Sequence, residues 1–308
     1  MATVTSITTT YAGEKASPYI KAALLSGNTL ANGLVTIKPN IKYKQVVKKL
    51  AVGSLLADAT CDFQDTSTVD LTERVLEPKE LQVNLELCKK DFRSDWDAIS
   101  MGYSAFDSLP PDFASFLIAT VAEKVAAQNE VAIWRGATGT GGSFNGFGTL
   151  IALDADLPAA HEITGTTVTA SNVVAQLQLI VAQIPQEIYG SADGMIYVAP
   201  NIYRAYVQAL GTLGYVDKFN NQTLNGLVID GVPIVMTNGL ASNTAIFAEK
   251  SNLWFGTGLF NDTNEVQVLD MADKDGSQNV RMIMRMTAGC QYGNITEIVT
   301  YGIVNSAN

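Results

Sequence analysis

The stretch WRGATGTGGSFNGFG, Trp134–Gly148, has the composition of a phosphate-binding loop, because it holds six glycines in fifteen residues. Phosphate loops precede a helix, whose free N–H groups and dipole attract anions, whereas this loop follows a long segment with helical periodicity. It has no lysine in a G-x-x-x-x-G-K-[ST] frame, and Phe144 stands where G-x-G-x-x-G requires its third glycine. We interpret the loop as a turn, with Gly136 in the left-handed conformation that often ends a helix.

The other side chains that could do chemistry are scattered. His161, beside Glu162, is the only histidine and is interpreted as a surface-loop residue, because general acid–base catalysis needs partners that the sequence does not identify. Cys61, Cys88 and Cys290 lack the spacing of a zinc site, and their odd number suits a reducing compartment. The sequence therefore predicts no catalytic residue, no cofactor and no metal ion.

The segment DKDG, Asp273–Gly276, departs from the calcium-loop frame D-x-[DN]-x-[DN]-G, because Gly276 follows Asp273 by only three residues. We expect a hairpin turn there instead. An enzyme is supported only by the alternation of helices and strands over residues 171–257, which many folds share. The sequence thus indicates a chain that is not an enzyme.

Composition and charge point to contacts with other chains. The chain is 47% hydrophobic and only 16% charged, which suits a surface partly buried against other subunits. The sequence contains no run of eighteen apolar residues that could span a membrane, and the N-terminus MATVTSITTT lacks a signal-peptide pattern. Residues 1–50 carry seven lysines and one acid, so this segment is +6 and the rest of a chain of net charge −10 is −16. Such asymmetry predicts an N-terminal arm with its own partner, either nucleic acid or, as the alternation in IKPNIKYKQVVKK favours, an acidic neighbouring subunit.

The first half of the chain is expected to hold one long helix and one hairpin. A helix over residues 108–135 is indicated by Ser108 as its N-cap, by Pro110 and Pro111 in its first turn, and by its apolar periodicity. A shorter helix is predicted in YKQVVKKLAVGSLLAD, residues 43–58. LQVNLELC, residues 81–88, alternates with period two, and DLTERVLEP, residues 70–78, is expected to pair with it as a projecting hairpin whose open edges need cover.

Helices and strands alternate in the second half. Residues 169–188 form an amphipathic helix pattern, GMIYVAP is a buried strand, and residues 201–214 form a second helix. Two short strands flank the turn Asp230-Gly231, and residues 244–256 supply a further strand. The C-terminus is expected to form three strands, and in NVRMIMRMTA a basic, semi-polar face alternates with an apolar one.

The order of these elements resembles that of major capsid proteins of tailed bacteriophages with the Hong Kong 97 capsid fold. The passages that carry the resemblance are RGATGTGGSFNGFGTL after the long helix, MIYVAPNIYRAYVQAL, IDGVPIVMTN, and AIFAEKSNLWFG. The resemblance implies an α+β fold with an N-terminal arm (1–52), an extended loop (53–100) and a peripheral domain with a spine helix (101–149). An axial α/β domain (150–257) and strands returning to both domains (258–308) would follow.

The resemblance also implies function and partners. The chain would assemble with copies of itself, as hexamers and pentamers, into the icosahedral head shell of a virion, with double-stranded DNA on its inner face. Assembly in the bacterial host cytoplasm and separate scaffolding, portal and head-decoration proteins are further implications. Some relatives cross-link subunits through lysine and asparagine. We expect no cross-link here, although Lys79, Lys89 and Lys90 lie in the loop.

Charged residues of the arm and loop are the candidate contacts between subunits. The heterologous contacts of a projecting loop can close into rings and shells. The candidates are Lys42, Lys44, Lys48, Lys49, Glu73, Arg74, Glu77 and Lys79.

Three other classes of protein remain for comparison. An encapsulin-type nanocompartment shell shares the fold but encloses enzymes, and a cytosolic α/β enzyme would share only the element alternation. A jelly-roll capsid protein would need eight strands and no long central helix, so the helix over residues 108–135 argues against it.

Overall fold

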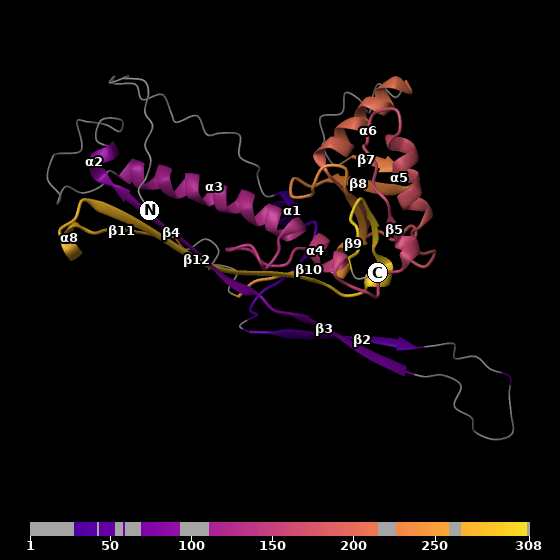
Figure 1. Cartoon of the computed structure of the whole chain (residues 1–308), viewed down its shortest axis with the longest axis horizontal. Helices are drawn as coiled ribbons and strands as arrows, with labels where there is room; N and C mark the ends of the chain where they lie inside the picture. The colour runs from indigo at the N-terminus through magenta and orange to yellow at the C-terminus, as the bar shows by residue number, and fades with distance from the viewer. Residues whose placement is uncertain are drawn as a thin grey trace. The chain divides into compact units, whose positions relative to one another are not determined.

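The computed structural model describes residues 28–41, 43–52, 58, 69–92, 111–214, 226–258 and 266–306. Within these the chain divides into two compact units. The first contains Gln82–Ala126 and Thr263–Arg285, and the second contains Ser26–Leu81, Ala127–Asp262 and Met286–Asn308. The predicted arm up to residue 27 and most of residues 53–68 lie outside the described part of the chain. Figure 1 shows the elements along the chain.

The long helix α3 (Pro111–Arg135) has residues in both units, and it confirms the predicted helix from Pro111 onward. The predicted N-cap Ser108 and Pro110 lie outside the described residues. Pro111 is the first residue of α3, where a missing N–H costs nothing, and no glycine or further proline interrupts the helix. The strand β12 (Asn279–Tyr292) is likewise continuous through both units.

The first unit is built on an antiparallel hairpin of β11 (Val266–Asp270) with the beginning of β12. The turn expected at Asp273–Gly276 is confirmed: it is the short helix α8 (Ala272–Asp275), which ends at Gly276 with a φ of 73°. The predicted alternation is confirmed as well, because Val280, Met282 and Met284 are buried while the arginines are not. The strand β4 (Lys79–Cys88) pairs with β12 and leads into α2 (Lys89–Phe92), where the buried Lys89 forms an ion pair with Asp270.

The second unit contains a six-stranded sheet that is buried on both faces. Side chains on one face, such as Ile196 and Phe247, pack against two helices, and those on the other, such as Tyr197 and Ile246, pack against Trp134 and its neighbours. The helices are α5 (Val173–Ala182) and α6 (Pro200–Thr212), as predicted. The strand order is β5 (Glu162–Ile163), β13 (Val299–Tyr301), β9 (Ala245–Glu249), β6 (Gly194–Val198), β8 (Val232–Met236) and β7 (Leu227–Ile229).

The predicted turn between β7 and β8 is confirmed. Asp230 and Gly231 have φ values of 46° and 84°, as the two central residues of a type I′ hairpin require.

A smaller sheet packs with the end of α3 in the same unit. The strand β1 (Thr36–Lys38) lies parallel to β10 (Leu253–Gly256), which pairs antiparallel with the end of β12. The short helices α1 (Asn28–Ala31) and α4 (Phe147–Ala152) complete this core, together with the 3-10 turns Lys250–Asn252 and Ile295–Glu297. A further 3-10 turn, Ala159–His161, has no buried residue.

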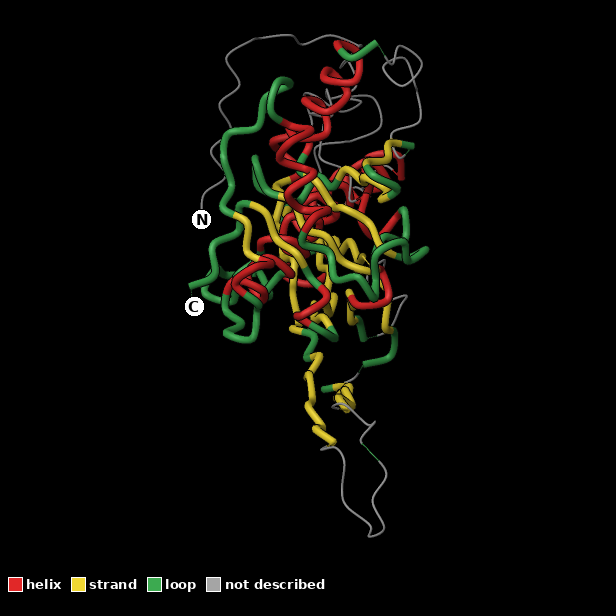
Figure 2. The backbone as a smooth tube through the Cα atoms, turned by 90° about the vertical axis from the view of Figure 1, so that its right-hand side faces the viewer, coloured by secondary structure: helices red, strands yellow, loops and turns green. Residues whose placement is uncertain are grey.

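The strands β2 (Gln45–Val52) and β3 (Val69–Leu76) form a separate two-stranded antiparallel ribbon, visible in both views (Figures 1 and 2). The helix predicted over residues 43–58 is therefore wrong. Its β-branched residues Val46 and Val47 favour extended backbone, and eight consecutive cross-strand pairs outweigh the weak helical preference of lysine and leucine.

The predicted pairing of residues 70–78 with 81–88 is also wrong. Only Glu77 and Pro78 separate β3 from β4, and the two strands belong to different sheets. Period-two alternation identifies a strand, but it carries no information about which strand lies beside it.

Close packing explains more of the glycines in this loop than a left-handed backbone does. Gly136 is not left-handed, so that prediction is wrong; the left-handed glycine of the loop is Gly142, with a φ of 75°. A Cβ on Gly136 would lie 2.3 Å from the carbonyl oxygen of Phe144, and one on Gly146 would lie 2.3 Å from that of Ala132. The loop therefore folds back onto the last turns of α3, which places the Phe147 ring 5.5 Å from that of Trp134.

Candidate functional site

The ribbon β2–β3 turns one face away from the rest of its unit, and this outward face carries three cross-strand pairs. Val46 stands opposite Val75, and both are exposed, by 48% and 37%. Lys48 stands opposite Glu73 in the register. At the base, Lys44 Nζ lies 2.9 Å from Glu77 Oε2. Four of the eight candidate residues thus lie on one face, arranged as opposite charges around an apolar pair.

The inward face of the ribbon is anchored by packing and by one backbone contact. Leu76 is fully buried against Gly256, where a Cβ would come within 3.0 Å of the leucine. Gln291 Nε2 donates a hydrogen bond of 3.0 Å to the Val75 carbonyl oxygen. β3 is therefore joined to β10 and to the end of β12 at its last two residues.

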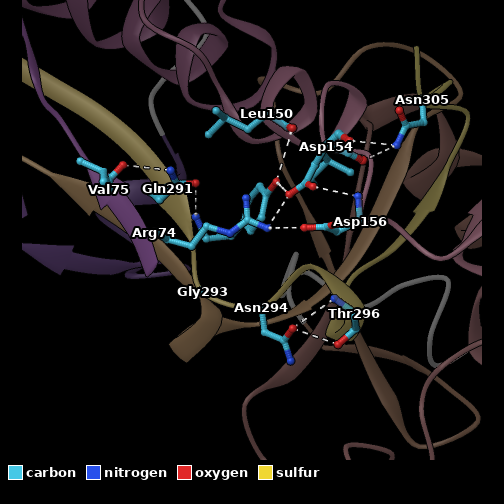
Figure 3. A network of polar contacts seen from close by, with 12 residues as sticks. Arg74, Val75, Leu150, Asp154, Asp156, Gln291, Gly293, Asn294, Thr296 and Asn305 are labelled. Carbon is cyan, nitrogen blue, oxygen red and sulfur yellow. Dashed lines mark hydrogen bonds and ion pairs between the residues drawn. The ribbon is translucent and has the colours of Figure 1, made fainter. Parts of the chain in front are cut away.

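Arg74 lies two residues before Leu76 on the same face of β3. Among the described residues of the inward face it makes the most extensive polar contacts (Figure 3). One of its guanidinium nitrogens lies 2.7 Å from Asp154 Oδ2 and 3.8 Å from Asp156 Oδ2. Its guanidinium carbon lies 5.2 Å from the centre of the Tyr292 ring, within the range of a cation–π contact. A charged, planar group is thus held by two carboxylates and an aromatic ring at the base of the ribbon.

Asp154 is itself fixed by three neighbours. The Tyr292 hydroxyl donates to Asp154 Oδ2 at 2.5 Å, and the Asp156 N–H donates to Oδ1 at 3.0 Å. Asn305 Nδ2 donates to the Asp154 carbonyl oxygen at 2.7 Å, from the side away from Arg74 (Figure 3). Burial raises the pKa of Asp154, but the hydrogen bonds from Tyr292 and Asp156 and the charge of Arg74 outweigh it and hold the pKa below its usual value.

The other candidate residues are placed as follows. Lys79 Nζ donates a 2.9 Å hydrogen bond to the Ser143 carbonyl oxygen, so it joins the start of β4 to the glycine-rich loop. Lys49 is a residue of β2, and Lys42 lies outside the described residues. No sequence pattern pointed to Asp154, Tyr292 or Asn305, because residues so distant along the chain share no motif with Arg74.

An open groove of about 280 Å³ lies along β2 in the same unit. Val47 and Lys48 line one side of it, and Trp254, whose ring lies 5.7 Å from Lys38 Nζ, lines another. The remaining lining residues are Glu249, Ser251, Asn252, Gly293, Asn294 and Glu297. The lining holds no histidine or cysteine, and it adds an accessible concave surface beside the outward face.

The residues first considered for chemistry are not gathered at this site. His161 is half-buried at the end of a 3-10 turn, and burial lowers its pKa. Cys290 is buried, which raises the pKa of its thiol, and Cys61 lies outside the described residues. Within the described ranges, no group of three histidine, cysteine or acidic residues is placed to hold a metal ion. No helix in the described part of the chain is both long and apolar enough to cross a membrane.

Comparison with solved structures shows the fold of the chain. It is similar to the capsid of the native GTA particle, with 14% identity, 91% of each chain covered and a TM-score of 0.58. It is similar to a chain of Mycobacterium phage Ogopogo, with 11% identity, 90% and 92% covered and a TM-score of 0.59. A chain of the satellite phage P4 procapsid matches with 12% identity, 90% and 89% covered and a TM-score of 0.56.

No protein-family model and no curated protein matches the sequence. The structural matches nevertheless span about nine tenths of both chains. The α+β fold is therefore that of the Hong Kong 97 type, as expected.

Proposed function

We propose that this chain, which has the fold of phage capsid proteins, is a major capsid protein: a structural protein, not an enzyme, that assembles with copies of itself into an icosahedral head shell. The observation that carries the proposal is the likeness to capsid chains over about nine tenths of the length. In this reading the chain resides in the virion and encloses the double-stranded DNA of a tailed phage.

The ribbon supports the proposal independently. A two-stranded ribbon has two free edges, and such edges pair with other chains unless something covers them. Its outward face exposes the Val46–Val75 pair, which no other part of the described chain covers. Another copy is the natural cover, and a contact between different surfaces of identical chains closes into rings when the rotation between copies is fixed.

We assign parts of the fold to parts of the shell subunit accordingly. The six-stranded sheet with α5 and α6 forms the axial domain, and α3 with β11 and β12 forms the peripheral domain. The extended loop includes β2 as well as β3, so it begins before residue 53. Residues 28–41 of the predicted arm pack within their own unit, so the part of the arm before residue 28 is the part assigned to a neighbouring subunit or the packaged DNA. Scaffolding, portal and decoration proteins are the further partners.

The first test is to express the chain alone and to examine it by negative-stain electron microscopy and light scattering. Closed shells, tubes or capsomer rings are expected. The double variant Val46→Ser, Val75→Ser is expected to fold, with an unchanged circular dichroism spectrum, and to lose most of its assembly. Leu179→Ser, a matched change of an exposed apolar residue on α5, controls for lost surface hydrophobicity.

Several outcomes would count against the proposal. A monomer that does not assemble, even with crowding agents or a scaffold present, would favour a cytosolic α/β enzyme instead. Shells from the natural source that hold protein cargo and no DNA would indicate a nanocompartment. Full assembly of the serine variant would remove the ribbon from the interface.

A further inference from the structure

We infer that Arg74, Asp154 and Tyr292 form a joint that fixes the direction in which the ribbon leaves its unit, and that this joint selects closed shells of uniform size. The inference rests on the proposed function for its second half only. Its first half concerns the single subunit and is testable without assembly.

The joint matters because the two anchors at the end of β3 lie at one level of the ribbon. The Leu76 side chain packs on Gly256, and the Val75 carbonyl accepts from Gln291, which are contacts of adjacent residues. Two contacts so close together hold the end of β3 in place but allow it to tilt about that point. Arg74 reaches past them to Asp154, so it adds a third point of attachment away from the first two.

The chemistry of Arg74 suits an angular constraint. Its guanidinium is planar and meets Asp154 on its edge while the Tyr292 ring lies near its carbon atom. Asp154 cannot follow a moving arginine, because the Tyr292 hydroxyl and the Asp156 N–H hold its carboxylate and Asn305 holds its backbone. The next residue, Ser306, donates from its N–H to the Ala152 carbonyl at 2.8 Å, so the C-terminal segment stiffens the end of α4 as well.

The length of the ribbon explains why its direction matters. Eight residues of β-strand span about 26 Å, so a tilt of about 10° at the base moves the far end of β2 by about 5 Å, the spacing between two strands. A displacement of that size puts the ribbon out of register with whatever surface of the neighbouring copy it meets. The rotation between copies is then no longer fixed, and open or irregular assemblies compete with closed ones.

A merely stabilising role would have different consequences. The Arg74 side chain is 29% exposed and that of Asp154 only 9%, but Asp154 keeps its hydrogen bonds from Tyr292 and the Asp156 N–H when Arg74 is lost. Loss of Arg74 is therefore expected to leave the subunit folded and to act on geometry. Arg281 provides the control for loss of an arginine ion pair elsewhere, because its pair with Glu86, 3.0 Å apart, is more exposed and lies in the other unit.

The direct test measures the ribbon direction in unassembled subunits. Spin labels on non-natural residues at positions 46 and 179 report the distance from the ribbon to α5. One narrow distance peak is expected for the native chain and for Arg281→Met, and a broad distribution for Arg74→Met. Arg74→Lys, which keeps the charge but loses the planar fork, and Tyr292→Phe, which keeps the ring but loses the hydroxyl, are expected to lie between them.

The same variants are then examined by negative-stain microscopy. The native chain and Arg281→Met should give shells of one diameter, and Arg74→Met should give spirals, sheets or shells of several diameters at similar total yield. A narrow peak for both native chain and Arg74→Met overturns the joint, whether or not anything assembles. A broad peak for Arg74→Met with uniform shells overturns the selection of shell geometry. A native chain with a narrow peak that never assembles instead contradicts the proposed function and leaves the joint standing.

Discussion

The buried carboxylate of Glu130 joins the short helix α1 to the long helix α3. It is 1% exposed and accepts from the Thr29 N–H at 3.0 Å and from the Thr29 hydroxyl at 2.5 Å. The hydroxyl oxygen in turn accepts from Trp134 Nε1 at 2.8 Å. Burial raises the pKa of Glu130, and the hydrogen bonds from Thr29, Trp134 and the Gly239 N–H oppose it without cancelling it.

This arrangement predicts a specific pH dependence. Because the pKa of Glu130 is higher in the folded chain, the folded state binds more protons just above the ordinary value of 4.5. Its contribution to stability is therefore largest below that value and falls as the pH rises through the raised pKa. Glu130→Gln abolishes this component. It should also lower the free energy of unfolding by about 1–3 kcal/mol, because an amide NH₂ would face a donor where the carboxylate accepts.

Urea unfolding of unassembled Glu130→Gln and native subunits at several pH values checks this. The stability gap between them should be largest at acidic pH and narrow as the pH rises. A gap that is constant, or that widens with pH, would show that Glu130 is not the group responsible.

At the scale of elements, the glycine-rich loop shows how a local signal can be recognised and still be misread. Its glycines predicted a turn, but Gly136, Gly146 and Gly148 are small because backbone carbonyls of α3 and of the loop itself approach them. The loop thereby carries Ser143 to Lys79 and α4 to the position from which Asp154 meets Arg74. The carbonyl oxygens of the last turns of α3 face Gly146 and Gly148, which is the polarity of a helix C-terminus.

Two glycine substitutions separate packing from turning. Gly146→Ala is expected to destabilise the subunit by about 1–3 kcal/mol, because its Cβ would lie 2.3 Å from a backbone oxygen that cannot move without distorting α3. Gly139→Ala is the control, since its Cβ meets nothing within 4 Å and its φ is not left-handed. Thermal unfolding of both variants measures the difference, and equal losses would mean that flexibility, not close packing, selects glycine here.

Sequence reasoning succeeded where the determining interactions are local. The helices α3, α5 and α6 and the Asp230-Gly231 hairpin follow from periodicity, caps and turn residues that lie within one segment. It failed for β2, whose extended form depends on pairing with β3, and for the partner of β3. It found charged residues of the ribbon but not the joint, because Arg74 meets Asp154 and Tyr292 only after three distant elements have packed.

At the scale of the whole molecule, the proposed assembly depends on how charge is distributed over each copy of this chain. Each copy carries a net charge of −10, so copies repel one another at a distance. The sequence suggested that basic residues of the first fifty overcome this by meeting acidic neighbours. In the structure, however, Lys44 pairs with Glu77 of its own chain and Lys48 stands opposite Glu73, so the outward face of the ribbon is locally balanced. What that face offers to a neighbour is the apolar pair Val46–Val75 and the free strand edges.

This balance makes the salt dependence of assembly diagnostic. Salt shortens the Debye length from about 10 Å at 0.1 M to about 3 Å at 1 M, so it weakens repulsion between copies while leaving apolar contacts intact. Assembly followed by light scattering should therefore become faster and more complete as sodium chloride is raised, and Lys48→Gln should change that dependence little. If the contacts were instead ion pairs between a basic arm and acidic neighbours, the same titration would dissolve the assemblies, and Lys48→Gln would shift the midpoint to lower salt. Because the two mechanisms give slopes of opposite sign, one titration distinguishes a ribbon that docks through its valines from one that docks through its lysines.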